Sequence, residues 1–195
     1  MNIYRYKGFT IEVSDDATYQ IDSGDNTFKY SKHYFSDGAR DYATSKHSIK
    51  ISKDEDLLND CIIIGSGGAT DIQAKSSLIN DDEILICCCD TVFCLSLIDL
   101  QIKWSTRSDE ATCFGIYSLN KHYIVHGEMQ ISKLDKDGNT IWQFSGSDIF
   151  VSSDDEDAFK LDIDNIELRD YHGIKYKLDF DGNVIYTPYF KTTMI

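Results

Sequence analysis

A ten-residue pattern that occurs twice constrains the fold of this chain more than any other feature. Lys133–Trp142 (KLDKDGNTIW) returns 44 residues later as Lys177–Tyr186 (KLDFDGNVIY), and a more degenerate copy, Leu95–Trp104, lies 38 residues before the first. Each copy follows an apolar segment about 20 residues before its closing aromatic residue: Ile84–Ile86, Tyr123–Val125 and Ile166–Leu168. The chain therefore repeats a unit of about 40 residues that contains short strands and an Asp-Gly turn.

The remaining sequence also favours strands. Residues 3–6 and 9–13 flank Lys7-Gly8 and predict an opening hairpin. No segment keeps apolar residues at helical spacing over eleven residues, so the best helix candidate is Lys53–Asn59, with one or two turns. The length of 195 residues suits a single compact domain, which we expect to consist of a hairpin region, residues 1–60, packed on a repeat region, residues 61–195.

The repeat resembles that of a known family. Leu134–Trp142 reads Leu-Asp-x-Asp-Gly-x-x-x-Trp and is similar to the repeat of quinoprotein-type β-propellers. The resemblance covers about Cys61–Tyr186 and implies that the Asp-Gly turn joins two strands of a blade, while the Trp packs between blades. Because only three or four blades fit, we expect an all-β, propeller-like array of three to four antiparallel sheets, incomplete or open, with little helix. The quinone and metal sites of complete propellers are not expected.

Charge is the main indication of a partner. The chain carries 33 acidic and 19 basic residues, a net charge of −14, although Lys29–Lys53 contains six basic and two acidic residues. Such an acidic surface disfavours nucleic acids and membranes and favours a basic partner. The candidate partner-binding residues are the consecutive carboxylates Asp154, Asp155, Glu156 and Asp157, for which a solvated turn is the alternative interpretation.

A second resemblance concerns function. Ala111–Tyr117, His126–Glu128 and Trp142–Val151 are similar to segments of small bacterial immunity proteins from polymorphic-toxin and contact-dependent-inhibition systems. It implies a non-enzymatic protein that neutralises a cognate basic toxin, such as a nuclease, by occluding its active site. Two alternatives remain open. One is a propeller-type protein-interaction scaffold, and the other is a nucleotide-binding protein that uses the glycine-rich loop Gly65–Thr70.

No pattern predicts catalysis, a metal site or a cofactor. Asp135–Asn139 begins like a calcium loop but lacks its later Gly and Glu, and a hairpin turn explains it equally. In the strand predicted over Ile84–Cys89, Cys87 and Cys89 share one face and Cys88 lies on the other, so the three cannot meet at one zinc ion. His126 and Glu128 share a strand face, where a polar pair is a simpler interpretation than acid-base chemistry.

The sequence also bears on the cellular compartment. The first residues lack the order of a secretory signal, and the apolar run Ile84–Cys89 is too short to cross a membrane. We therefore expect a cytoplasmic protein whose six cysteines are free thiols. The oligomeric state is left open.

Overall fold

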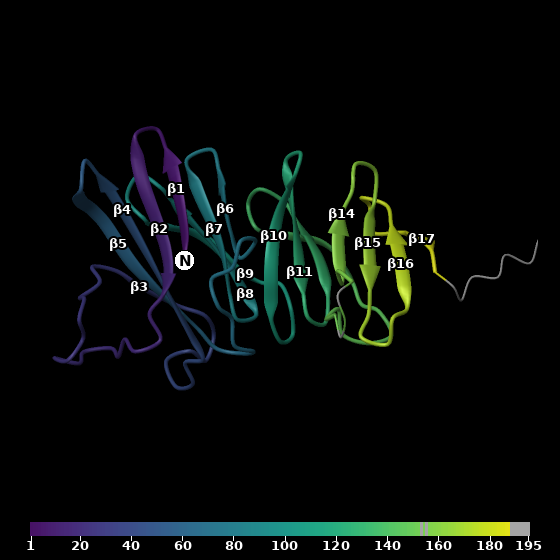
Figure 1. Ribbon diagram of the computed structural model, residues 1–195, viewed down its shortest axis with the longest axis horizontal. Coiled ribbons are helices and arrows are strands. Elements are labelled where there is room, and N and C mark those ends of the chain that lie inside the picture. Colours follow the sequence, from purple (N-terminus) through teal and green to yellow (C-terminus); the bar gives the residue numbers. More distant parts are fainter. Residues whose placement is uncertain (153, 155, 188–195) are drawn as a thin grey trace, which may run out of the picture.

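The structure is a computed structural model that describes residues 1–152, 154 and 156–187 (Figure 1). These residues form strands and turns without a helix, in four sheets that lie side by side. The five-stranded first sheet has the order β1-β2-β4-β5-β3, with β1 (Asn2–Tyr6), β2 (Phe9–Asp15), β3 (His33–Phe35), β4 (Ser45–Lys53) and β5 (Asp56–Gly65). The sequence prediction of an all-β, propeller-like array is confirmed.

The three remaining sheets are four-stranded antiparallel meanders, the arrangement of a propeller blade. The second sheet contains β6 (Ser77–Asn80), β7 (Glu83–Cys88), β8 (Thr91–Ser96) and β9 (Ile102–Arg107). The third contains β10 (Cys113–Leu119), β11 (His122–Gly127), β12 (Ile131–Leu134) and β13 (Thr140–Phe144), and the fourth contains β14 (Phe159–Leu161), β15 (Ile166–Arg169), β16 (Lys175–Leu178) and β17 (Val184–Tyr186). In the described part of the chain, no strand pairs the fourth sheet with the first, so the array is open.

Three apolar layers hold the sheets together, one between each pair of neighbours. Strand β7 shows the principle, because Ile84 and Ile86 pack toward the first sheet while Leu85 and Cys87 pack toward the third. All four side chains are fully buried. A strand with both faces buried needs no polar alternation, which explains the continuous apolar run in the sequence.

The repeated Asp-Gly turn and the tryptophan of the preceding sheet form one recurring joint. The Asp135 carboxylate accepts hydrogen bonds from the backbone N–H groups of Asp137 (2.9 Å) and Asn139 (2.8 Å), so the turn satisfies itself without a metal. The indole of Trp104 donates to the carbonyl oxygen of Lys136 in that turn, at 3.1 Å. Trp142 donates in the same way to Phe180 of the next sheet, at 3.2 Å, so the tryptophans pack between blades as the propeller resemblance implies.

The helix expected over Lys53–Asn59 is wrong. Strands β4 and β5 meet there in a two-residue turn in which Asp54 and Glu55 have φ values of 49° and 73°. Two consecutive residues with positive φ are the signature of a tight hairpin, here built without glycine. The boundary expected between residues 60 and 61 falls inside β5.

The expected alternation of the three cysteines is also wrong at its last position. Strand β7 ends at Cys88, and Cys89 has a φ of 54°, which turns the chain. Cys88 and Cys89 therefore face the same apolar layer, and Cys87 faces the opposite one. All six cysteines are buried free thiols, which agrees with their interpretation as small apolar side chains.

Candidate protein-binding site

The acidic segment lies in the connection between β13 and β14, and its carboxylates differ in their surroundings. Arg169 forms a two-pronged ion pair with Asp154, with nitrogen to oxygen distances of 2.5 and 2.7 Å. Glu156 contacts Lys175 Nζ at 3.0 Å. Asp157 is exposed and forms no ion pair with a described residue, whereas Asp155 lies outside the described residues.

These cations neutralise only part of the local charge. Residues 145–187 contain 11 acidic and 4 basic side chains, so less than a quarter of the chain carries half of the net charge of −14. Each of the four cations is already engaged by a carboxylate: Lys160, Arg169, Lys175 and Lys177. The guanidinium of Arg169 also holds the pKa of Asp154 well below its usual value. The fourth sheet and its leading segment therefore keep a negative surface at neutral pH.

A shallow surface hollow of about 310 Å³ lies beside the acidic segment. Its aromatic lining comes from Phe114, His126 and Phe150, and Asp154, Glu156 and Asp157 stand around it. His126 Nε2 lies 3.0 Å from the carbonyl oxygen of Phe150, and its ring stacks on Phe159 with centroids 4.9 Å apart. Burial lowers the pKa of His126 to about 4, so the ring is neutral at pH 7.

The contacts of His126 and Glu128 fit a structural role better than the acid-base pair considered from the sequence. His126 is held by Phe150 and Phe159. The backbone of Glu128 donates to Thr112 at 2.8 Å and accepts from Phe150 at 2.7 Å, and so joins two sheet connections. Both residues stabilise the boundary between the third and fourth sheets.

A second hollow runs along the first strands of all four sheets. It has a volume of about 420 Å³ and is lined by Tyr4 of β1, Ser77–Ile79 of β6, Ile116–Ser118 of β10 and Leu161 of β14, together with Ala74 and Lys75. Lys75 Nζ lies 5.6 Å from the ring centroid of Tyr117. In a closed propeller the first strands surround a central channel. In this open array they form an accessible groove.

The glycine-rich loop Gly65–Thr70 connects the first sheet to the second and is packed against the chain. The N–H of Gly68 donates to the carbonyl oxygen of Ala111 at 2.9 Å. A Cβ atom at Gly68 would lie 1.8 Å from Thr112 Oγ1. In the described residues no helix follows the loop, whereas a dinucleotide site needs one. Close backbone packing explains these glycines.

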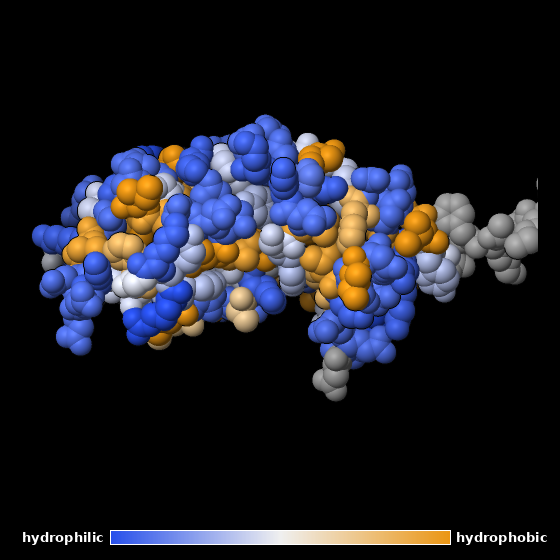
Figure 2. Space-filling model, turned by 90° about the horizontal axis from the view of Figure 1, so that it is seen from above, coloured by the Kyte–Doolittle hydropathy of each residue, from blue (hydrophilic) through white to orange (hydrophobic). Residues whose placement is uncertain are grey.

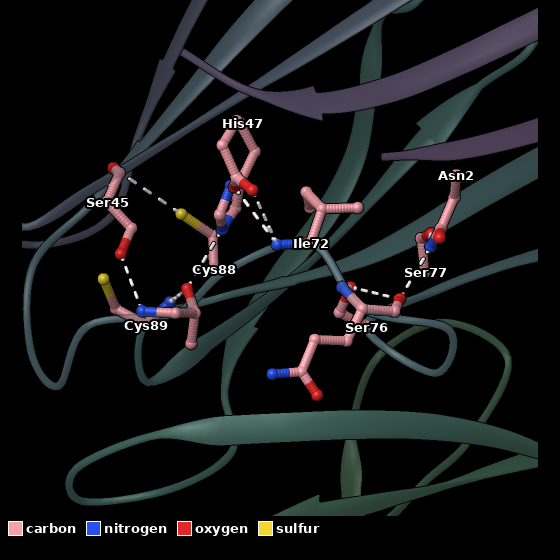
Figure 3. Close-up of polar contacts among 11 residues, drawn as sticks. Asn2, Ser45, His47, Ile72, Ser76, Ser77, Cys88 and Cys89 are labelled. Atoms are coloured by element: carbon pink, nitrogen blue, oxygen red, sulfur yellow. Dashed lines mark hydrogen bonds and ion pairs between the residues drawn. The ribbon is translucent and has the colours of Figure 1, made fainter. Parts of the chain in front are cut away.

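A polar chain centred on the buried side chain of His47 lies near this loop and was not predicted from the sequence. Asp15 Oδ1 lies 2.8 Å from His47 Nδ1, and His47 Nε2 lies 3.0 Å from Thr70 Oγ1. Figure 3 labels His47, the centre of this chain. Thr70 Oγ1 also accepts the N–H of Cys89 at 3.0 Å, so the chain links the first sheet to a turn of the second (Figure 3). Burial lowers the pKa of His47 although Asp15 opposes the shift. The side chain of His47 is fully buried, and the network acts as an inter-sheet clamp.

Asp109 is a similar clamp between the second and third sheets. It too was not predicted from the sequence. Its carboxylate accepts four backbone N–H groups, from Ala111, Thr112, Met129 and Gln130, at 2.7 to 2.9 Å. A sequence signal exists, because Ser66–Thr70 (SGGAT) and Ser108–Thr112 (SDEAT) are versions of one inter-sheet connection. Comparing these two connections would have identified both as structural.

Cations of the basic segment Lys29–Lys53 pack on aromatic rings in or next to the segment and bond to the preceding connection. Lys50 Nζ lies 4.0 Å from the ring centroid of Phe28, and the guanidinium of Arg40 lies 4.0 Å from that of Phe35. Lys46 donates to the carbonyl oxygen of Tyr19 at 2.6 Å. These contacts fasten the long connections of the first sheet.

The part of the chain that the structure describes contains neither a candidate metal site nor a helix that could span a membrane. Residues 1–152, 154 and 156–187 contain no group of three or more His, Cys, Asp or Glu side chains placed to hold a metal ion. The same residues contain no helix that is long and apolar enough to span a membrane.

Comparison with known proteins supports the fold alone. No protein-family model matches the chain, and no curated protein matches it. Among solved structures, the computationally designed Ika8 protein is similar with a TM-score of 0.52 and 6% identity, over 73% of this chain and 45% of that one. The AfRom2 CNH domain matches with a TM-score of 0.47 and 11% identity, over 75% of this chain and 48% of that one.

A third solved structure is BamB from Moraxella catarrhalis, a β-propeller, with a TM-score of 0.43 and 17% identity over 75% of this chain and 43% of that one. The chain thus spans less than half the length of each of these three structures.

Proposed function

We propose that this chain is a non-enzymatic protein-binding module that recognises a partner with a basic surface. The observation that carries the proposal is the excess of carboxylates in residues 145–187, where 11 acidic side chains face 4 basic ones that are all ion-paired. A shallow hollow with the exposed ring of Phe114 in its lining lies beside this surface. Carboxylates would speed association with a basic partner, and a buried apolar contact would anchor it.

The more specific form of the proposal is an immunity protein that neutralises one bacterial toxin. The toxin's substrate-binding cations would pair with the carboxylates of Glu156 and Asp157 and of the neighbouring Asp154 and Asp155. This would occlude the toxin's active site without a chemical step. The resemblance of Ala111–Tyr117 and Trp142–Val151 to immunity proteins supports this form.

The test begins with the product of the neighbouring gene. We expect it to be toxic on its own, to be harmless when co-expressed with this chain, and to co-purify with it. If the neighbour is harmless, or if toxicity persists on co-expression, the immunity form is wrong.

The binding surface is tested with two double variants of equal charge change. Glu156→Gln with Asp157→Asn should weaken partner binding at least tenfold and reduce its salt dependence. Asp22→Asn with Asp25→Asn changes two exposed carboxylates in the connection between β2 and β3 and should leave the affinity within about twofold. Equal effects of the two pairs would contradict a site at the acidic segment.

A second candidate function is a scaffold that binds extended peptides. The groove formed by Tyr4, Ile79, Tyr117 and Leu161 favours it, because this groove crosses all four sheets. A scaffold should capture several partners with weak affinity, whereas an immunity protein should capture one with high affinity. Pull-down followed by a count of partners therefore separates the two.

A further inference from the structure

An apolar crevice opens between the hairpin tips of the first and second sheets. Its walls are Tyr6 and Phe9 of the first hairpin, Leu58 of β5, and Leu97 and Ile98 of the β8–β9 turn. Leu58 is 51% exposed and Ile98 is 77% exposed, and neighbouring Leu57 is 45% exposed. Figure 2 views the molecule from above in Figure 1 and shows separate apolar patches among hydrophilic residues toward the end that carries the first sheet.

The crevice has the size of one bulky apolar side chain. Its volume is about 160 Å³, close to the ~150 Å³ of an apolar protein cavity that accepts benzene. Its floor includes Ile51, which is 2% exposed and belongs to the apolar layer between the first two sheets. The Asn59 side chain donates to the carbonyl oxygen of Ile98 at 3.1 Å and holds the two walls together.

The charges around the crevice indicate which residues should flank the apolar side chain of a partner. The turns beside it carry six carboxylates and two cations: Asp54, Glu55, Asp56, Asp81, Asp82 and Asp99 against Lys7 and Lys53. Lys7 is already paired with Asp82 at 2.7 Å. Lys53 Nζ lies over the ring of Phe9, 5.9 Å from its centroid. The rim is therefore net negative and complements lysine or arginine.

We propose that this crevice binds a partner segment in which one leucine- or phenylalanine-sized side chain is flanked by basic residues. The apolar side chain fills the space between Leu58 and Ile98, and its basic neighbours pair with the acidic turns. Interfaces of this kind concentrate their affinity in one buried anchor within a polar rim. The crevice is formed by the first two sheets, so the proposal does not depend on the acidic segment between β13 and β14.

The test uses the peptide acetyl-Lys-Lys-Phe-Lys-Lys-amide and the full chain labelled with ¹⁵N. We expect saturable chemical-shift changes centred on Leu58, Asn59, Leu97 and Ile98. Replacing the peptide's phenylalanine by alanine should weaken binding at least tenfold, because the buried apolar area is lost. Replacing its four lysines by glutamates should weaken binding at low salt. If the alanine peptide binds equally well, binding is only electrostatic and the proposal is wrong.

Two matched variants locate the site. Ile98→Ser removes an exposed side chain from the crevice wall, and Ile163→Ser removes one that is 94% exposed in the turn between β14 and β15. We expect at least fivefold weaker binding for Ile98→Ser and unchanged binding for Ile163→Ser. Both should melt within about 2 °C of the parent protein, because exposed sites away from special features change stability little. Equal peptide affinity in all three proteins would overturn the proposal.

Discussion

Trp142 of the third sheet packs its indole ring directly against Gly182 of the fourth. A Cβ atom at Gly182 would lie 2.7 Å from Cδ2 of that ring, and the indole nitrogen donates to Phe180 in the same turn. Trp104 of the second sheet makes the equivalent contact with Gly138 of the third sheet. The repeat in the sequence thus encodes the joint between sheets as well as the sheets themselves.

Gly182→Ala should destabilise the protein more than Gly8→Ala. Both glycines have φ near +84°, so both substitutions carry the left-handed backbone cost of about 1–2 kcal/mol. Only Gly182 meets a ring, whereas a Cβ atom at Gly8 has nothing within 4 Å. Overpacking against Trp142 should add about 1–3 kcal/mol to the loss of unfolding free energy. Urea denaturation of both variants measures the difference, and equal losses would contradict the proposed joint.

His126 should make stability depend on pH between 6.5 and 4. Burial lowers its pKa from 6.5 to about 4, so the folded state favours the neutral ring and the unfolded state binds a proton more readily. The stability it contributes is complete above pH 6.5 and is lost as the pH falls toward 4, by at most about 3 kcal/mol. In an NMR titration, His126 should stay neutral at pH 5. His126→Gln should flatten this part of the pH profile, and an unchanged profile would assign the dependence to other groups.

Asp109→Asn should be among the most destabilising single-atom changes in the chain. The Asp109 side chain accepts four backbone N–H groups and is 2% exposed, so an amide would turn an NH₂ group toward two donors. We expect a loss of about 3 kcal/mol or more in the free energy of unfolding. Asp135→Asn is the control, because that carboxylate serves an exposed turn and should lose about 1 kcal/mol. Chemical denaturation compares the two, and equal losses would show that Asp109 does not clamp the sheets.

The repeat made much of this fold predictable. Copies of one short pattern imply that each 40-residue unit builds the same sheet, and the turns at Asp137-Gly138 and Asp181-Gly182 follow from the positive φ that glycine allows. The tryptophan at a fixed distance from the turn pointed to packing between units. These features are local in sequence, and they lie in the structure where the resemblance implied.

Features that depend on distant contacts or unusual backbone were not predictable. Asp54, Glu55 and Cys89 adopt positive φ without being glycine, which a residue pattern does not show. Strand β3 pairs in parallel with β5, and it follows a long connection rather than a tight turn. The ion pair between Arg169 and Asp154 joins residues 15 positions apart. The sequence therefore identified the acidic segment but not that part of it is neutralised within the protein.

The loop Gly65–Thr70 should not confer nucleotide binding. The N–H of Gly68 is bonded to the carbonyl oxygen of Ala111, and the side chain of Thr112 fills the space beside Gly68. Addition of millimolar ATP, GTP or NAD should leave the melting temperature unchanged, since only ligands that bind the native state raise it. Gly68→Ala should lower the melting temperature in the absence of any nucleotide, because the new Cβ atom collides with Thr112 Oγ1. A nucleotide-dependent rise that Gly68→Ala abolishes would restore the nucleotide-binding alternative.

The two ends of the array are covered in different ways, and this should limit end-to-end association. On the first sheet, Tyr19, Tyr30 and Ala39 of the long connections pack over Ile62 and Ile64. On the fourth sheet, the outward face carries Lys160, Glu167 and Lys177 across neighbouring strands, with Glu167 within 4 Å of both lysines. Terminal repeats of stacked proteins use such polar faces to stay soluble.

Replacing the residues on the outward face of the fourth sheet tests its role as a cap. Lys160→Leu, Glu167→Leu and Lys177→Leu together would create an apolar sheet face, and sedimentation should then show association that increases with concentration. The matched set Lys160→Gln, Glu167→Gln and Lys177→Gln removes the same charges but keeps the face polar, so it should sediment like the parent protein. Association of the glutamine set would mean that charge repulsion, rather than polarity of the face, keeps the fourth sheet from stacking on another copy.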